Sequence, residues 1–129
     1  STFTNYAFDF DAQWGKVGEE GLYVLGEYLQ GNNNTAAKPT MRGIQGIAAF
    51  NIRMKSPTSW LYAVEPAFRI DLADPNTDAD NDWVTTLTAV LGIYMSSKAQ
   101  LRVAYERESF QASGAPSISG IRSALTVNF

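Results

Sequence analysis

The 129-residue sequence contains no cysteine and no histidine. These absences exclude disulfides, thiol nucleophiles, histidine-based triads and the usual zinc sites. No apolar run reaches the roughly 20 residues that a transmembrane helix requires, so a helical span is excluded as well. The net charge is -3, and there is no basic stripe with interleaved aromatics. Nucleic acid is therefore not an expected partner.

Apolar residues instead recur at every second position along most of the chain. In the first such segment Tyr6, Phe8 and Phe10 alternate with Asp9 and Asp11. A period of two predicts strands with one apolar and one polar face. The predicted strands are residues 3–14, 21–30, 44–54, 60–72, 83–95, 100–110 and 120–129.

The last of these segments ends on an aromatic residue. It sets Ile121, Leu125 and Val127 against Arg122 and closes on Phe129, a pattern typical of the C-terminal strand of outer-membrane β-barrels. In such strands one face meets lipid and the other meets water. We therefore expect an all-β fold, an antiparallel up-and-down transmembrane β-barrel segment that forms one unit over residues 1–129.

The predicted connections alternate in character. Residues 15–20, 55–59 and 96–99 are short, whereas 31–43, 73–82 and 111–119 are longer and rich in Asn, Asp, Ser, Gly and Pro. Short periplasmic turns and long extracellular loops are typical of outer-membrane barrels. Counted back from a periplasmic Phe129, this pattern places Ser1 on the extracellular side.

The odd number of predicted strands has a topological consequence. The first and last strands run in the same direction, so they cannot pair antiparallel, and bacterial single-chain barrels have an even strand number. An open edge in a bilayer leaves backbone groups unpaired. We expect this chain to be the C-terminal portion of a larger porin-type barrel, whose remaining N-terminal strands, in the same gene product or a separate chain, cover both edges.

Several short motifs occur in a fixed order between Glu65 and Glu108. EPAFRIDLADPN is followed by LGIY and then by LRVAYERE, and GEY occurs earlier, at residues 26–28. This order resembles the C-terminal end of Gram-negative outer-membrane porins of the phosphate-selective family. The resemblance implies a barrel of about 14 to 18 strands, commonly a homotrimer, that passes small anionic solutes.

Charged residues occupy the polar faces of the predicted strands. Charges inside a narrow aqueous pore set the field that an ion crosses. Two interpretations stay open: the arginines attract anions, or neighbouring arginines and carboxylates neutralise one another along the wall. The candidate pore-lining residues are Arg53, Arg69, Arg102, Arg122, Glu27, Glu65, Asp71, Glu106 and Glu108.

The opposite faces should meet lipid. Mid-strand apolar residues are expected to contact the bilayer; they are Phe8, Val64, Ile70, Leu91, Val103 and Leu125. Aromatic residues beside the short turns are expected to form a periplasmic girdle; they are Trp14, Trp60, Tyr62, Tyr94 and Phe129. Pro66 has no N–H for a ladder, so a bulge or local break is expected there.

One loop spaces oxygen ligands as a calcium loop does, at Asp74, Asn76, Asp78, Asp80 and Asp82. Ala79 and Thr85 stand where a calcium loop has its glycine and its bidentate glutamate. We therefore interpret the segment as a solvated acidic loop and predict no metal and no cofactor.

The sequence as a whole predicts a porin segment of the bacterial outer membrane that allows passive diffusion of small hydrophilic solutes, anions among them, without catalysis. Two other interpretations remain: a structural β-barrel scaffold of an outer-membrane complex, and a soluble antiparallel sandwich that binds carbohydrate. An outer-membrane hydrolase is disfavoured because there is no histidine and no serine in a recognisable nucleophile setting.

Overall fold

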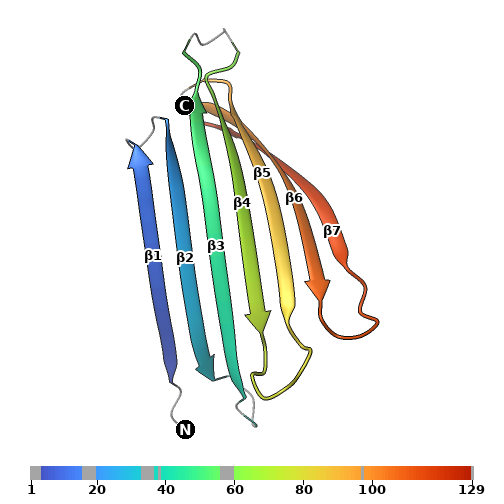
Figure 1. The fold of residues 1–129 in the computed structure, drawn as a ribbon. Helices are drawn as coiled ribbons and strands as arrows, with labels where there is room; N and C mark the ends of the chain where they lie inside the picture. The colour runs from blue at the N-terminus through green and yellow to red at the C-terminus, as the bar shows by residue number, and fades with distance from the viewer. Residues whose placement is uncertain are drawn as a thin grey trace.

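The computed structural model describes residues 4–15, 20–32, 37, 39–55, 60–96 and 98–128. Seven strands form one sheet in which every strand pairs antiparallel with its neighbour in sequence (Figure 1). The strands are β1 (Asn5–Gly15), β2 (Gly21–Asn32), β3 (Thr40–Arg53), β4 (Ala63–Asp74), β5 (Val84–Tyr94), β6 (Ala99–Phe110) and β7 (Ile118–Val127). This arrangement confirms the predicted all-β, up-and-down meander. None of the described residues belongs to a helix long and apolar enough to cross a membrane.

The register sets many apolar residues opposite apolar residues, although Arg107 stands opposite Leu87. Ile44 stands opposite Leu72, and Leu91 opposite Val103. Because neighbouring side chains on a strand point to opposite faces, a slip of one residue would exchange the two faces of that strand. The observed registers hold the predicted apolar positions of all seven strands on one face and the predicted charged positions on the other.

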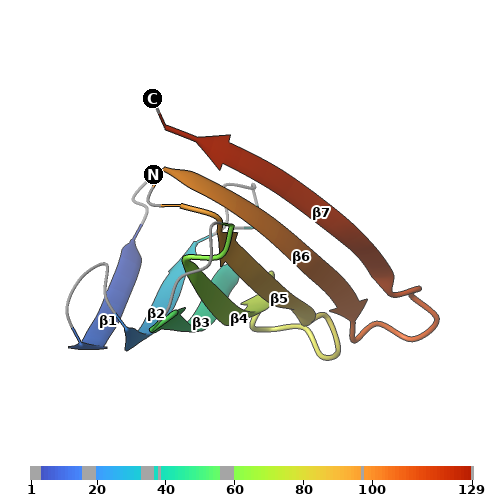
Figure 2. The same ribbon diagram turned by 90° about the horizontal axis from the view of Figure 1, so that it is seen from above.

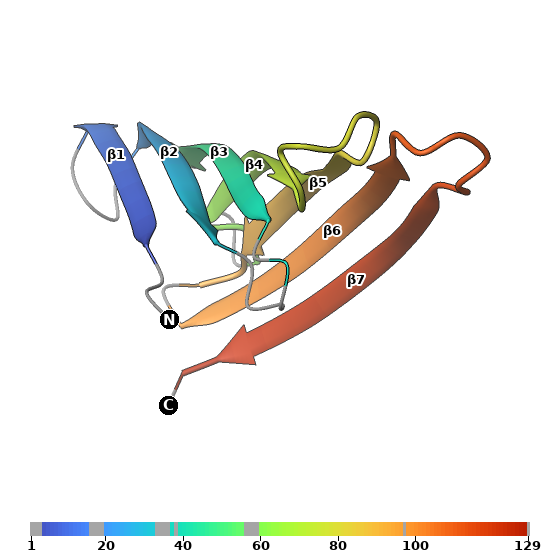
Figure 3. The same ribbon diagram turned by 90° about the horizontal axis from the view of Figure 1, so that it is seen from below.

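The sheet is strongly curved but not closed. Figures 2 and 3 show it bending into an arc, with β1 on one arm and β7 on the other. The strand order ends at β1 and β7, which do not pair with each other. Both strands therefore present a backbone edge without a partner in the described part of the chain.

In the part of the chain that the structure describes, no second layer packs against the apolar face of the sheet. Among the described residues Ala63 is the buried hydrophobic residue, whereas Phe8 is 68% exposed and Leu125 is 64% exposed. A β-sandwich would bury such side chains between two sheets. The single layer contradicts the soluble sandwich interpretation.

The connections lie at two ends of the sheet. We name the end with residues 33–39, 75–83 and 111–117 the loop end, and the end with residues 16–20, 54–62 and 95–98 the turn end. The predicted contrast in length is wrong for one pair: β3 begins at Thr40 and β4 at Ala63, so the 54–62 connection is as long as 75–83. The backbone N–H of Met54 still donates to the carbonyl of Tyr62 at 3.1 Å, which continues the ladder beyond the strand ends.

Pro66 interrupts pairing on one side of its strand only. Between β3 and β4 the paired residues pass from Ala49–Ala67 to Ile52–Val64, with the same register on both sides of the gap. On the other side Pro66 pairs with Leu91 in an unbroken ladder. The predicted local break is therefore confirmed toward β3, and there is no bulge, because proline removes a donor without adding a residue.

Candidate functional site

The predicted pore-lining residues share one face of the sheet. Glu27, Gln45 and Asp71 stand in one cross-strand row. The same face carries the other predicted positions, through the rows Arg69–Thr88–Glu106–Gly120, Glu65–Gly92–Arg102–Ala124, Arg53–Ala63–Tyr94 and Ala67–Val90–Ala104–Arg122, with Glu108 opposite Thr86.

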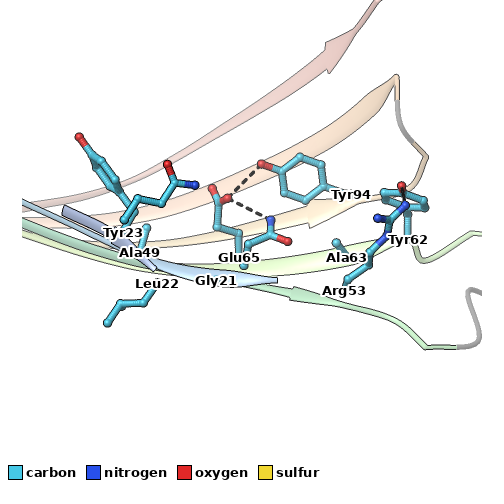
Figure 4. Close-up of a pocket in the computed structure, with 11 residues that line it drawn as sticks. Gly21, Leu22, Tyr23, Ala49, Arg53, Tyr62, Ala63, Glu65 and Tyr94 are labelled. Atoms are coloured by element: carbon cyan, nitrogen blue, oxygen red, sulfur yellow. Dashed lines mark hydrogen bonds between the residues drawn. The ribbon is translucent and has the colours of Figure 1, made fainter. Parts of the chain in front are cut away.

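This face lies on the concave side of the arc. In Figure 4, Tyr23 and Glu65 project toward the side on which the distant strands curve over, whereas Leu22 projects away from it. The exposures agree: Glu65 and Asp71 are half-buried, whereas Phe68 on the opposite face of β4 is 49% exposed. We name the two sides the concave face and the outward face.

Two arginines of the concave face are paired with carboxylates. Arg69 donates through Nε and Nη2 to the two oxygens of Asp71 at 2.7 and 2.8 Å. Arg122 on β7 donates through Nη2 to Glu106 on β6 at 2.7 Å. These side chains are exposed or half-buried, so each pair contributes little to stability. Each pair cancels charge locally. For Arg69 and Arg122 this fits the interpretation in which neighbouring arginines and carboxylates neutralise one another along the wall.

Carboxylates outnumber arginines on the concave face, and the two groups separate along the strands. The carboxylates of Asp9, Glu27 and Glu108, all in the row nearer the loop end, form no ion pair within the described part of the chain. Arg53 and Arg102 lie nearer the turn end. The concave face therefore changes from acidic near the loop end to mixed and aromatic near the turn end.

A pocket of about 410 Å³ opens on the concave face near the turn end (Figure 4). Glu65 lies in it, and its Oε2 accepts hydrogen bonds from the Tyr94 hydroxyl and from Asn51 Nδ2, both at 3.2 Å. Asn51 and Glu65 both lie within the interruption in pairing near Pro66, where their side chains meet through this hydrogen bond. At Gly92, the next residue in the row of Glu65, an added Cβ would lie 3.2 Å from Gln100 Nε2 and 3.4 Å from Glu65 Cβ, so the side chains of Gln100 and Glu65 already occupy the space beside it.

The predicted aromatic girdle is partly wrong. Trp14 is 58% exposed on the outward face, and Trp60 is 64% exposed near the turn end. Tyr94 instead lies on the concave face, because its pairing with Ala63 places it on the polar side of β5. Tyr62 lies against Arg53, whose guanidinium carbon is 4.8 Å from the ring centre. Phe129 lies outside the described residues.

A charged cluster on the outward face was not identified from the sequence. Arg42 of β3 pairs with Asp74 of β4, with Nε 2.9 Å from Oδ2, and the Asp74 side chain is only 2% exposed. The Arg42 guanidinium also lies over the Trp83 ring at 4.8 Å. The sequence interpretation placed Arg42 and Asp74 in loops, since alternation of apolar residues carries no signal for the charged residue that ends a strand.

The acidic loop is organised by its own backbone. The N–H of Asn76 donates to Asp74 Oδ1 at 3.2 Å, and the N–H of Asp78 donates to Asn76 Oδ1 at 3.1 Å. Asp74 thus uses both carboxylate oxygens on Arg42 and the loop. Across the described residues, no group of three or more His, Cys, Asp or Glu side chains is placed to hold a metal ion.

Comparison with known proteins gives no relative: no family model, no curated protein and no solved structure matches this chain. The described strands form a single sheet whose concave face is charged and polar and whose outward face is mainly apolar.

We expect Arg42→Met to lower the free energy of unfolding by about 1–3 kcal/mol, because it leaves the buried Asp74 carboxylate without its ion pair. The matched control is Arg122→Met, whose exposed pair with Glu106 should contribute less than about 1 kcal/mol. Denaturant unfolding followed by tryptophan fluorescence measures both. An equal decrease in the free energy of unfolding in the two variants would show that burial of Asp74 does not strengthen its ion pair.

Proposed function

We propose that this chain is part of the wall of a bacterial outer-membrane pore that allows passive diffusion of small hydrophilic solutes. The observation that carries the proposal is the two-sided single layer: large apolar side chains cover the outward face, and charged side chains cover the concave face. Burial of apolar surface stabilises by about 25 cal/mol per Å². A sheet with this much exposed apolar surface is expected to be covered by another apolar phase. A bilayer can do this for a curved sheet that further strands close into a barrel.

The open edges support a larger assembly. The edges of β1 and β7 carry backbone donors and acceptors that lack partners in the described residues. In hydrocarbon each unpaired group costs several kcal/mol. We therefore propose that strands from outside residues 1–129 pair antiparallel with both edges and close the barrel. Assembly as a homotrimer stays a prediction of the family resemblance.

The alternative is a barrel that serves only as a structural scaffold in an outer-membrane complex. Conductance separates the two: the gene product that contains this chain, reconstituted in planar bilayers, should give single-channel steps. A protein that inserts and closes as a barrel but passes no current would support the scaffold.

The facing of the strands can be tested at two neighbouring positions of β5. A nitroxide at Leu91 should be relaxed by oxygen, which concentrates in lipid, and a nitroxide at the adjacent Val90 should be relaxed by an aqueous nickel complex, because the two side chains point to opposite faces. Replacing Leu91 with arginine should destabilise the folded protein in the bilayer by about 2–4 kcal/mol. Greater aqueous accessibility at Leu91 than at Val90 would reverse the assignment.

The pairing of Arg69 with Asp71 gives a test of the pore wall. Arg69→Gln leaves the Asp71 carboxylate uncompensated, so the reversal potential in a salt gradient should move toward cation preference. The double variant Arg69→Gln with Asp71→Asn removes both charges and should restore the original value within error. If the double variant stays as cation-selective as the single one, the two charges do not act as a neutral pair.

The edge proposal predicts a separation between β1 and β7 in the closed protein. Neighbouring strands lie about 4.8 Å apart, so nitroxides at Ala12 and Leu125 would broaden each other strongly if the two strands paired. We expect no such broadening, whereas labels at Leu101 and Leu125, which stand opposite each other on β6 and β7, should show it. Strong dipolar broadening between Ala12 and Leu125 would indicate parallel closure of these seven strands.

A further inference from the structure

The pocket on the concave face differs in chemistry from the rest of that face. Near the loop end the wall carries unpaired carboxylates, whereas the pocket brings together amide, tyrosine, carboxylate and guanidinium groups. Gln13, Tyr23, Asn51, Arg53, Glu65 and Tyr94 are among the residues that line it. They come from β1 to β5, so the pocket depends on the register of five strands.

Glu65 is a fixed hydrogen-bond acceptor in this pocket. The Tyr94 hydroxyl and Asn51 Nδ2 both donate to Oε2, which sets the plane of the carboxylate. Glu65 forms no ion pair with any described residue. Its Oε1 atom therefore stays available for a donor from a solute, already oriented by two neutral neighbours.

Gln13 and Tyr23 provide the opposite side of the pocket. They stand directly opposite each other on β1 and β2, and neither side chain makes a hydrogen bond to another described residue. The amide of Gln13 offers both donors and an acceptor, and Tyr23 offers a ring and a hydroxyl. Figure 4 shows Tyr23 and Glu65 projecting from the same side of the sheet.

The residues that line the pocket include one carboxylate and one guanidinium, and a second guanidinium, that of Arg102, stands beside it in the row Glu65–Gly92–Arg102. Glu65 contributes one negative charge and Arg53, which lies against the Tyr62 ring, contributes one positive charge. An anion would meet the Glu65 carboxylate and a cation would meet Arg53. A neutral solute whose hydroxyl groups both donate and accept fits both groups, and its C–H faces can pack on tyrosine rings.

From this geometry we infer that the pocket is a subsite for an uncharged polyhydroxylated solute, such as a short oligosaccharide, on its way through the pore. The inference rests on the proposed pore function and adds a substrate class to it. Saturable binding in a pore needs contacts that are specific but weak enough for the solute to leave. A half-open pocket with a few fixed polar groups meets that requirement.

The test is the block of single-channel current by maltotriose in the full-length protein. We expect saturable block, and a polyethylene glycol of similar size should block without saturation. Glu65→Gln, which weakens a charge-assisted hydrogen bond, and Tyr23→Ala, which removes the ring, should each raise the Kd for maltotriose by about tenfold. Thr86→Ala, which removes a hydroxyl on the same face outside the pocket, should leave that Kd unchanged.

The outcomes separate the subsite from the pore. A conducting protein with no saturable block by maltotriose would overturn the subsite and leave the pore proposal standing. So would a block that inorganic phosphate or an organic cation produces and maltotriose does not, or a Kd that neither pocket variant changes. A protein that does not conduct at all would overturn both proposals.

Discussion

The main physical constraint on this structure is that one face of its single sheet is apolar and exposed, and such a face is stable in water only when it is covered. Side chains alternate in direction along each strand, and the seven registers keep Phe8, Phe68 and Leu125 on the same side. No other described part of the chain packs against them, and they stay exposed. The proposed function accounts for the exposed apolar face and the two open edges together, because further strands would pair with the edges and a bilayer would cover the apolar face.

The concave face is organised by short-range pairing. Residues two apart on a strand point the same way, which lets Arg69 reach Asp71, and neighbouring strands bring Arg122 to Glu106. These contacts neutralise charge where arginine and carboxylate alternate, whereas the carboxylates of β1 and β2 form no ion pair with another described residue. Beside the interruption in pairing near Pro66, Glu65 accepts hydrogen bonds from Asn51 and Tyr94. The wall therefore offers different environments at its two ends.

The outward face also changes toward the loop end. The Arg42–Asp74 pair sits there with Trp83 beneath the guanidinium, and Trp14 lies on the same face near the turn end. Tryptophan and arginine suit the boundary between hydrocarbon and water, since each has an apolar body and a polar tip. Their positions near opposite ends of the strands fit the proposal that the strands cross a membrane.

The sequence by itself determined the seven strands, their order and the facing of their apolar residues. The reason is that successive side chains of a strand point to opposite faces, so apolar residues at every second position share one face. Only the tertiary structure decided where β3 and β4 begin and that Arg42 meets Asp74. Each of these depends on which residue of the next strand stands opposite. Register is the pairing of residues between two strands, so the sequence of one strand alone does not determine it.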